Sequence, residues 1–260
     1  MKITLPDGSV RKLEVGSNGL DIANDIGAGL AKAALAVSVN GIQKDLSDPI
    51  NEDSDVSIIT IDSDEGLEIM RHTLTAQVLA RAVKNLYPDA KLAIGPTIKD
   101  GFYYDFEFVK SITPDDLEKI EKEMQKIINS KSAIIKKLHS KKDALKVFGS
   151  NAEPYKESII NESEQEDNFQ LYYQGNDEFV DLCRGPHLPN LKHIGAFKLT
   201  KLAGAYWKGD SKNKMLTRIY GTAWKNEKDL NAYLESIEEA EKRDHRKIGK
   251  EMNLFHFQEE

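Results

Sequence analysis

The sequence predicts an α+β fold with a small domain, a larger domain and a C-terminal helix. The 260 residues allow about two domains. Hydrophobic residues make up 40% and charged residues 30% of the chain, a balance typical of a globular protein. The first 62 residues follow the order β-β-α-β-β with a final strand, which suits a small sheet packed on one helix.

Residues 1–62 form the predicted small domain. Apolar residues alternate with polar ones on both sides of a turn at 6–8, which predicts a hairpin. Helical spacing over 20–26 ends at glycines, and strands are expected at 36–39 and 56–61. The pair at 40–41, Asn-Gly, is typical of a second hairpin turn.

A polar linker at 62–66 leads into the predicted larger domain, residues 63–226. Its first helix covers 67–86 and is stopped by Pro88. Thr113 and Pro114 are typical of the start of a second long helix. A short helix is expected at 141–148, with strands at residues 91–96, 101–106, 169–173, 178–182, 197–199 and 215–220. Residues 227–260 begin with an amphipathic helix.

Composition excludes several classes of protein. The single cysteine, Cys183, rules out a disulfide framework within the chain and favours a reducing, cytoplasmic location. No apolar run is long enough for a transmembrane helix, and the N-terminus lacks the apolar region of a signal peptide. The net charge of −7 argues against a generally basic nucleic-acid binder. However, residues 191–226 hold eight Lys and Arg against one acid, an excess that can attract a polyanion.

Cys183 and His187 flank a Gly-Pro turn, which brings their side chains toward each other. A thiol beside an imidazole can bind a metal, form a nucleophile pair or simply line a buried polar pocket. A zinc site needs about four ligands, or three and a water, and His72 is the one further natural candidate. Metal binding is therefore compatible with these residues but not required, and no residue is assigned to a metal.

The stretch 201–214 combines cations with aromatic side chains and small residues. Such a pattern suits phosphate contacts together with base stacking. The alternative interpretation is a solvated loop between strands with aromatic residues in the core. The candidate nucleic-acid contacts are Lys201, Tyr206, Trp207, Lys208, Lys212 and Lys214.

Five segments in order resemble the bacterial threonyl-tRNA synthetases: 93–96, 101–105, 183–187, 203–207 and 218–224. The resemblance covers essentially the whole chain. It implies a TGS domain of ubiquitin-like β-grasp fold over 1–62, a tRNA-editing domain over 63–226, and a linker over 227–260 toward a class II catalytic core. ATP, magnesium, zinc and a homodimer are implied only for that core, so this chain alone is not expected to charge tRNA. The implied partner is threonine tRNA.

The implied reaction is hydrolysis of seryl-tRNA that carries the threonine anticodon. Serine lacks one methyl of threonine, and a methylene-sized difference is worth only about 1–3 kcal/mol in a binding pocket, so a second, hydrolytic site is needed. The resemblance assigns six residues to catalysis: His72, Gln77, Cys183, His187, Asp181 and Lys156. It assigns Tyr104, Gly95, Arg184 and Pro186 to substrate binding.

The helix at 67–86 departs from the family pattern of two histidines four residues apart. Ala76 stands four residues after His72, and Gln77 falls where the second histidine would lie after a one-residue insertion. One extra residue turns the upstream helix by about 100° and takes His72 out of the pocket, unless a π-bulge absorbs it. Weakened editing is therefore one hypothesis, and retained editing through His72 and His187 is the other. The rival functions are a freestanding metal-dependent hydrolase and a non-catalytic tRNA-binding module.

Overall fold

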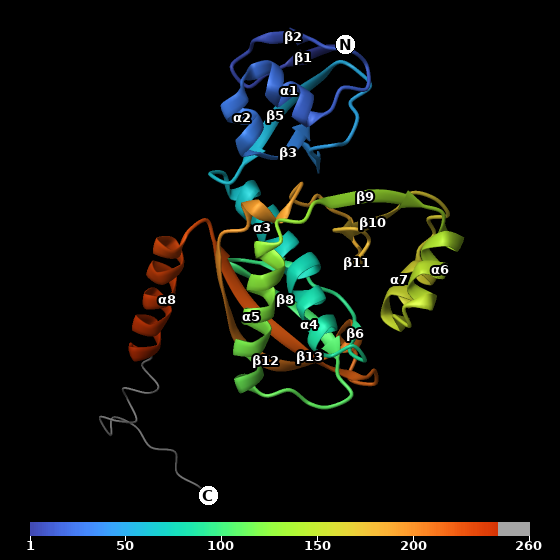
Figure 1. Ribbon diagram of the computed structural model, residues 1–260, viewed down its shortest axis with the longest axis vertical. Coiled ribbons are helices and arrows are strands. Elements are labelled where there is room, and N and C mark those ends of the chain that lie inside the picture. The colour runs from blue at the N-terminus through green and yellow to red at the C-terminus, as the bar shows by residue number, and fades with distance from the viewer. Residues whose placement is uncertain (244–260) are drawn as a thin grey trace, which may run out of the picture.

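The computed structural model describes residues 1–243 and confirms the α+β architecture. Figure 1 shows a small N-terminal unit above a central sheet with long helices, and a smaller lobe of strands and helices beside it. The rest of the predicted linker, residues 244–260, lies outside the described residues. No helix among the described residues is long and apolar enough to cross a membrane.

The N-terminal unit is a five-stranded mixed sheet with two short helices. Its strand order is β2-β1-β5-β3-β4, with β1 parallel to β5 and the other pairs antiparallel. Both predicted hairpins are confirmed. Helix α2 was not predicted because Gly27, which ends α1, also starts α2. The elements are β1 (Lys2–Thr4), β2 (Val10–Lys12), α1 (Gly19–Ile26), α2 (Ala28–Ala33), β3 (Ala34–Val39), β4 (Ile42–Asp45) and β5 (Ser54–Thr60).

One long helix then crosses the molecule and contains a π-helical segment. It consists of α3 (Asp64–Thr73), the π segment η1 (Leu74–Leu79) and α4 (Ala80–Leu86). Within η1 the backbone N–H of Ala80 donates to the carbonyl of Thr75, five residues back instead of four. A wider turn of this kind accommodates one extra residue while the flanking turns keep their faces.

The central sheet has the order β12-β13-β8-β6, with β7 paired to β8. Helix α5 (Pro114–Asn129), capped by Thr113 as predicted, packs against α4 and β12. The loop interpretation of 201–214 is wrong as far as residue 206, because β12 continues to Tyr206. The strands are β6 (Lys91–Leu92), β7 (Thr97–Ile98), β8 (Gly101–Glu107), β12 (Ala196–Tyr206) and β13 (Met215–Trp224), with short 3₁₀ turns η2 (Leu191–His193) and η3 (Trp207–Gly209).

The smaller lobe is a three-stranded antiparallel sheet in the order β11-β10-β9, with two helices packed against each other. Strand β9 (Ile134–His139) and helix α7 (Pro154–Glu162) were not predicted. Lysines interrupt the apolar pattern of β9, and α7 buries Lys156 beside its apolar residues, so neither shows a clear periodicity. The other elements are α6 (Lys141–Ser150), β10 (Phe169–Gln174) and β11 (Phe179–Leu182).

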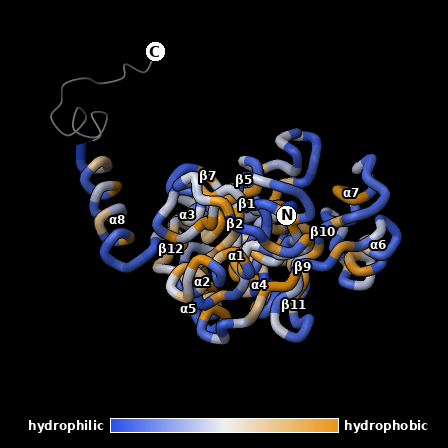
Figure 2. Tube along the Cα trace, turned by 90° about the horizontal axis from the view of Figure 1, so that it is seen from above, coloured by the Kyte–Doolittle hydropathy of each residue, from blue (hydrophilic) through white to orange (hydrophobic). Residues whose placement is uncertain are grey.

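The apolar core runs from the N-terminal unit into the central layer. Leu35, Ala36 and Ile59 belong to the same buried cluster as Ile69 and Met70 of α3. Figure 2 shows hydrophobic segments gathered inside the body, with α8 (Glu227–Lys242) at its edge, where it contacts β12 and β13. The N-terminal unit is therefore packed on the second domain through buried side chains.

Candidate functional site

Two histidines and the one cysteine meet between the long helix and the loop that follows β11. The Nε2 atom of His72 lies 2.9 Å from Sγ of Cys183. The imidazoles of His72 and His187 stack with centroids 4.5 Å apart. The structure therefore brings together three of the predicted catalytic residues, although 111 positions separate His72 from Cys183.

The hydrogen bonds of His72 fix which nitrogen carries its proton. Nδ1 lies 3.3 Å from the carbonyl oxygen of Pro186, and a carbonyl can only accept. Nδ1 is therefore the donor, and in the neutral ring Nε2 keeps its lone pair. Burial lowers the pKa of His72 below 6.5, against opposing effects of Pro186 and Asp181, so the ring is neutral at pH 7. His72 thus presents an unprotonated nitrogen to Cys183.

His187 is held from two sides. Its Nδ1 lies 3.1 Å from Oγ1 of Thr73, which also accepts the backbone N–H of Leu188 at 3.0 Å. Its own backbone N–H donates to Oδ1 of Asp45 at 2.8 Å. Burial lowers the pKa of His187. Among the described residues its Nε2 has no hydrogen-bond partner, although it is buried, so this atom is free to contact a bound molecule or water.

The π segment explains why His72 remains in this cluster. Removal of His72 from the pocket was the expected result of the extra residue without a π-bulge, and the structure has the π-helical turn just after Thr73. Ala76 and Gln77 are both buried there. Gln77 accepts from Gln174 through its backbone carbonyl at 3.0 Å, while its side-chain amide has no partner among the described residues. Gln77 is therefore inside the protein with its amide unused.

Lys156 and Asp181 form a buried ion pair. Nζ of Lys156 lies 2.6 Å from Oδ1 of Asp181, and both side chains are at most 4% exposed. The hydroxyl of Tyr104 donates to Oδ2 of Asp181 at 3.1 Å. Burial raises the pKa of Tyr104 well above its usual value, so the hydroxyl stays protonated and continues to donate. A Cβ at Gly95 would come within 2.1 Å of the Tyr104 ring, so packing requires glycine there.

The loop between Cys183 and His187 is shaped by Gly185. This residue has φ of +67°, and a Cβ there would lie 1.9 Å from the hydroxyl of Tyr172. Pro186 contributes its carbonyl to His72, and Arg184 is exposed beside it. Substrate binding by Gly95, Arg184, Pro186 and Tyr104 stays a prediction.

The predicted tRNA contacts lie at the end of the β12–β13 hairpin, except Lys201, which lies in the middle of β12. Trp207 packs edge-on against Tyr155 with centroids 4.8 Å apart, and Tyr206 is exposed. Lys201 lies over the ring of Tyr220, with Nζ 4.7 Å from the centroid. Lys212 is also exposed. Tyr155 precedes Lys156 on α7, so this helix touches both the hairpin and the buried ion pair.

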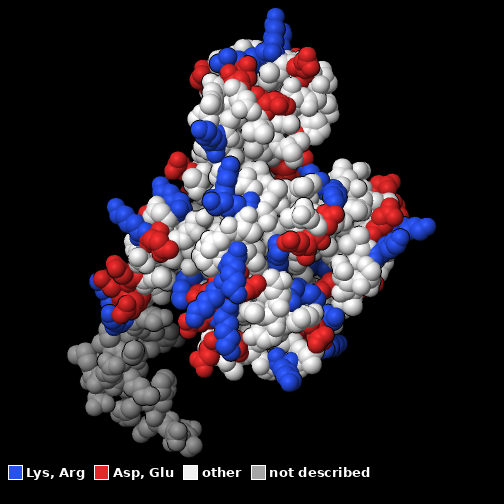
Figure 3. Space-filling model, in the orientation of Figure 1, with Lys and Arg blue, Asp and Glu red and all other residues white. Residues whose placement is uncertain are grey.

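Acids from other segments neutralise much of the charge excess in 191–226. Figure 3 shows Lys and Arg side chains interspersed with Asp and Glu. Five of the eight cations form ion pairs, and the acids come from segments far away in the sequence. The pairs are Lys198–Glu121, Lys208–Glu162, Lys214–Glu107, Arg218–Asp105 and Lys225–Asp62. The sequence excess therefore does not produce a continuous basic surface, although exposed pairs are weak and can exchange for phosphate.

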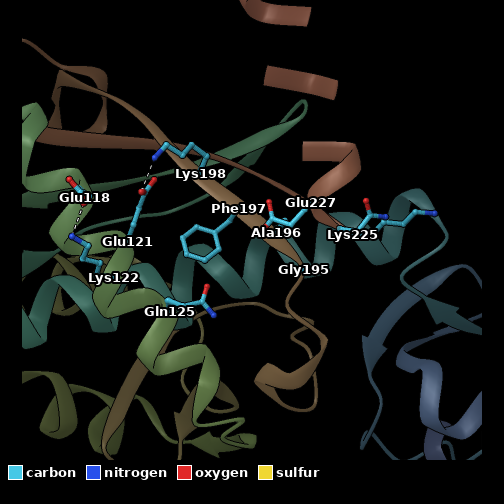
Figure 4. Close-up of a pocket in the computed structure, with 11 residues that line it drawn as sticks. Glu118, Glu121, Lys122, Gln125, Gly195, Ala196, Phe197, Lys198, Lys225 and Glu227 are labelled. Atoms are coloured by element: carbon cyan, nitrogen blue, oxygen red, sulfur yellow. Dashed lines mark hydrogen bonds and ion pairs between the residues drawn. The ribbon is translucent and has the colours of Figure 1, made fainter. Parts of the chain in front are cut away.

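A groove of about 810 Å³ lies elsewhere, between α5, the start of β12 and the start of α8 (Figure 4). Glu121 and Lys198 form an ion pair in its lining, with a distance of 2.9 Å between Oε2 and Nζ (Figure 4). It contains none of the predicted site residues. The groove is therefore separate from the cluster of His72, Cys183 and His187.

The same cluster has the donor set of a metal site. One ligand atom from each of His72, Cys183 and His187 lies within 4.8 Å of the other two. Two imidazoles and a thiol suit zinc, with one position left for water. No fourth protein ligand from His, Cys, Asp or Glu joins them among the described residues.

Three residues around the cluster were not predicted. Thr73 and Tyr172 contact the ring of His187, and Asp45 of the N-terminal unit accepts the backbone N–H of His187. Thr73 is adjacent to His72 in the sequence, and this adjacency could have indicated its place near the cluster. Asp45 and Tyr172 carry no local signal, because their role depends on contacts across the fold.

Comparison with known proteins finds two domain families that match separate segments of the chain. The TGS domain family matches residues 1–60, and the "Threonyl and Alanyl tRNA synthetase second additional domain" family matches 170–220. A threonine–tRNA ligase of Hahella chejuensis is 54% identical over 258 residues, 99% of this chain and 40% of the relative. Those of Prochlorococcus marinus and Paramagnetospirillum magneticum are 52% and 54% identical with the same shares covered. The chain spans 40% of the length of these relatives. It corresponds to the N-terminal portion of the bacterial threonine–tRNA ligases, with a TGS domain and the second additional domain.

Proposed function

We propose that this chain hydrolyses the ester of seryl-tRNA that carries the threonine anticodon, releasing serine. The observation that carries the proposal is the state of His72. Its Nδ1–H donates to the Pro186 carbonyl, so its Nε2 carries the lone pair and is a base within the partly buried cluster. The similarity to threonine–tRNA ligases supplies the substrate class.

The proposed reaction uses water as the nucleophile. The Cys183 thiol, which lies 2.9 Å from Nε2 of His72, first turns away; Nε2 then takes a proton from the water as the water oxygen attacks the ester carbonyl. The tetrahedral intermediate then loses the ribose oxygen, which recovers the proton from His72. The products are serine and free tRNA. The buried, unpartnered Nε2 of His187 supports a role in contacting the water or the developing oxyanion.

Lys156, Asp181 and Tyr104 supply the proposed recognition of serine. Their mutual bonds fix three polar groups in a buried wall, which favours a small polar amino acid over an apolar one. Threonine adds a methyl group, for which the close packing of these buried residues is proposed to leave no room. Gln77 is proposed to line the same region, since its unpaired amide is available to a bound molecule.

The proposed partner is threonine tRNA, held near its acceptor end. Tyr206 and the lysines at the β12–β13 hairpin are proposed to contact it, with Trp207 anchoring the hairpin. Aminoacylation, the cofactors ATP, magnesium and zinc, and a homodimer are proposed only for a protein in which this chain is joined to a class II catalytic core. None of them is proposed for the 260 residues alone. A cytoplasmic location is likewise proposed.

The test is single-turnover release of serine from seryl-tRNA by the 260-residue chain, with threonyl-tRNA as the control. Selective serine release supports the proposal. His72→Ala should abolish it, whereas Cys183→Ala should slow it only modestly, because the thiol is not the proposed nucleophile. Steep salt-dependent tRNA binding without serine release would instead favour a non-catalytic tRNA-binding module.

A second candidate is a metal-dependent hydrolase, favoured by the ligand set of His72, Cys183 and His187. In that case the metal would activate the water in place of His72. Stoichiometric zinc in the purified chain, and loss of hydrolysis on chelation, would support this candidate. Hydrolysis that resists chelators would support the metal-free route.

A further inference from the structure

A carboxylate of the N-terminal unit reaches the functional cluster of the second domain. Asp45, at the end of β4, is 7% exposed. Its Oδ1 accepts the backbone N–H of His187 at 2.8 Å. Its Oδ2 accepts the hydroxyl of Tyr172 at 2.6 Å. Asp45 therefore touches both the chain of His187 and the ring that packs edge-on against the His187 imidazole, 4.4 Å away.

A lysine of the second domain completes the coordination of this carboxylate. Nζ of Lys136 lies 2.9 Å from Oδ2 of Asp45 and also pairs with Asp48. Burial disfavours the charge on Lys136, but its bonds to the two acids outweigh burial and raise its pKa. The Asp45 carboxylate is thus charge-paired, well bonded and fixed in place.

The backbone N–H of His187 depends on Asp45. His187 is 2% exposed, and this N–H has no other acceptor among the described residues. Loss of the carboxylate would leave a buried donor unpaired, which the loop can relieve only by moving. Because the imidazole stacks on His72 at 4.5 Å, such a movement displaces the pair of rings.

We propose that Asp45 of the TGS domain is a positioning residue for His187, so that the functional cluster is complete only with the N-terminal unit in place. The proposal rests on the proposed hydrolysis for its effect on rate. The placement of His187 itself is independent of that function. Asp45 acts through the backbone of His187 and touches no proposed substrate atom.

The geometry distinguishes this positioning role from that of a residue that only holds the two domains together. Asp48 binds the same lysine and accepts the backbone N–H of Asp45 at 3.2 Å, but within residues 1–243 it makes no hydrogen bond to the His187 loop. A cavity of about 250 Å³ opens at this junction, and its lining includes Asp45, Ser47, Lys136 and His187. The N-terminal unit therefore borders the space next to His187, beyond its apolar contact with α3.

The test uses the full chain with Asp45→Ala, Asp45→Asn and the control Asp48→Ala. Both alanine variants remove one partner of Lys136, but Asp45→Ala also removes the acceptor of the His187 N–H and of the Tyr172 hydroxyl, so it should lower the unfolding midpoint more than Asp48→Ala. Only Asp45→Ala should slow single-turnover serine release, by about 10- to 100-fold, since a displacement near 1 Å has that effect. Asp45→Asn keeps an oxygen for the His187 N–H and should recover at least part of this loss.

A second readout does not need any hydrolysis. Selective ¹⁵N-histidine labelling gives at most six amide signals, because the chain has six histidines. Asp45→Ala should shift the His187 amide signal and speed its hydrogen exchange at least tenfold, while Asp48→Ala leaves both unchanged. Labelled His187→Gln identifies the signal by its disappearance.

The outcomes distinguish the positioning role of Asp45 from the proposed hydrolysis. Equal rates for the parent, Asp45→Ala and Asp48→Ala would overturn the positioning role, and so would an unchanged His187 amide in Asp45→Ala. If the parent releases no serine but its His187 amide responds to Asp45→Ala alone, the proposed hydrolysis fails and the placement of His187 by Asp45 stands.

Discussion

Deleting one residue from the π segment tests how this chain accommodates its extra residue. Ala76 is the suitable choice, because it is buried but makes no side-chain hydrogen bond. Without it, η1 can close as ordinary α-helix, and His72 and α4 keep their present faces. We therefore expect the deletion variant to fold with His72 still beside Cys183.

The expected change in stability is small. The deletion loses one buried methyl, about 0.8 kcal/mol. It also removes one residue whose backbone must be ordered, which returns about 1–2 kcal/mol. The net change in the free energy of unfolding should therefore stay within roughly 1 kcal/mol.

Deletion of Glu68 in α3 is the matched control, since it lies outside the π segment. With the downstream helix held in place, Glu65 moves into the position of Gly66. A Cβ at that position would lie 1.9 Å from the carbonyl oxygen of Thr60. The helix must shift or unwind there, at a cost of about 1–3 kcal/mol or more.

Urea unfolding at pH 7.5 compares the two deletions, and alkylation of the single thiol, Cys183, reports whether His72 is still beside it. We expect the Ala76 deletion to match the parent in both measurements. A loss of stability equal to that of the Glu68 deletion, or a large change in thiol reactivity, would show that the π turn is not what absorbs the extra residue.

Three further predictions concern the cluster. Burial lowers the pKa values of His72 and His187, so the unfolded chain binds protons first as the pH falls below about 6.5. The free energy of unfolding should thus fall from pH 7.5 to 5.0 in urea titrations, less steeply in His72→Gln; an identical slope would contradict this. Lys156→Met leaves Asp181 buried without its partner and should cost about 3–5 kcal/mol in urea unfolding, whereas adding Asp181→Asn should restore most of it. Gly185→Ala should lower the thermal unfolding midpoint by several degrees in calorimetry, because of its 1.9 Å approach to a tyrosine hydroxyl; an unchanged midpoint would refute that reasoning.

The sequence predicted much of the fold because most of its elements carry a local signal. The long helix from α3 to α4 and helix α5 have regular apolar stripes and clear start signals. Strand β9 and helix α7 lack such stripes, because each has a lysine that points inward to form an ion pair. Local periodicity does not show that Lys136 and Lys156 each meet a buried acid.

The candidate site was predictable to the extent that it resembles known segments. The motif from Cys183 to His187 and the helix with His72 are recognisable from residue types and order. The contact of Asp45 with His187 joins residues 142 positions apart. The balance of charge on the β12–β13 hairpin also depends on acids from α5, α7 and β8. Such pairings arise only once the chain has folded.

Two consecutive residues at the start of α7 contact different parts of the protein. Tyr155 rests on Trp207 at the tip of the hairpin and donates to Glu107, whereas Lys156 reaches Asp181 in the interior. A short, stiff helical turn joins the two contacts. A displacement of the hairpin tip would therefore either shift the ring of Trp207 against that of Tyr155 or move α7, and with it the Lys156 ammonium group that pairs with Asp181.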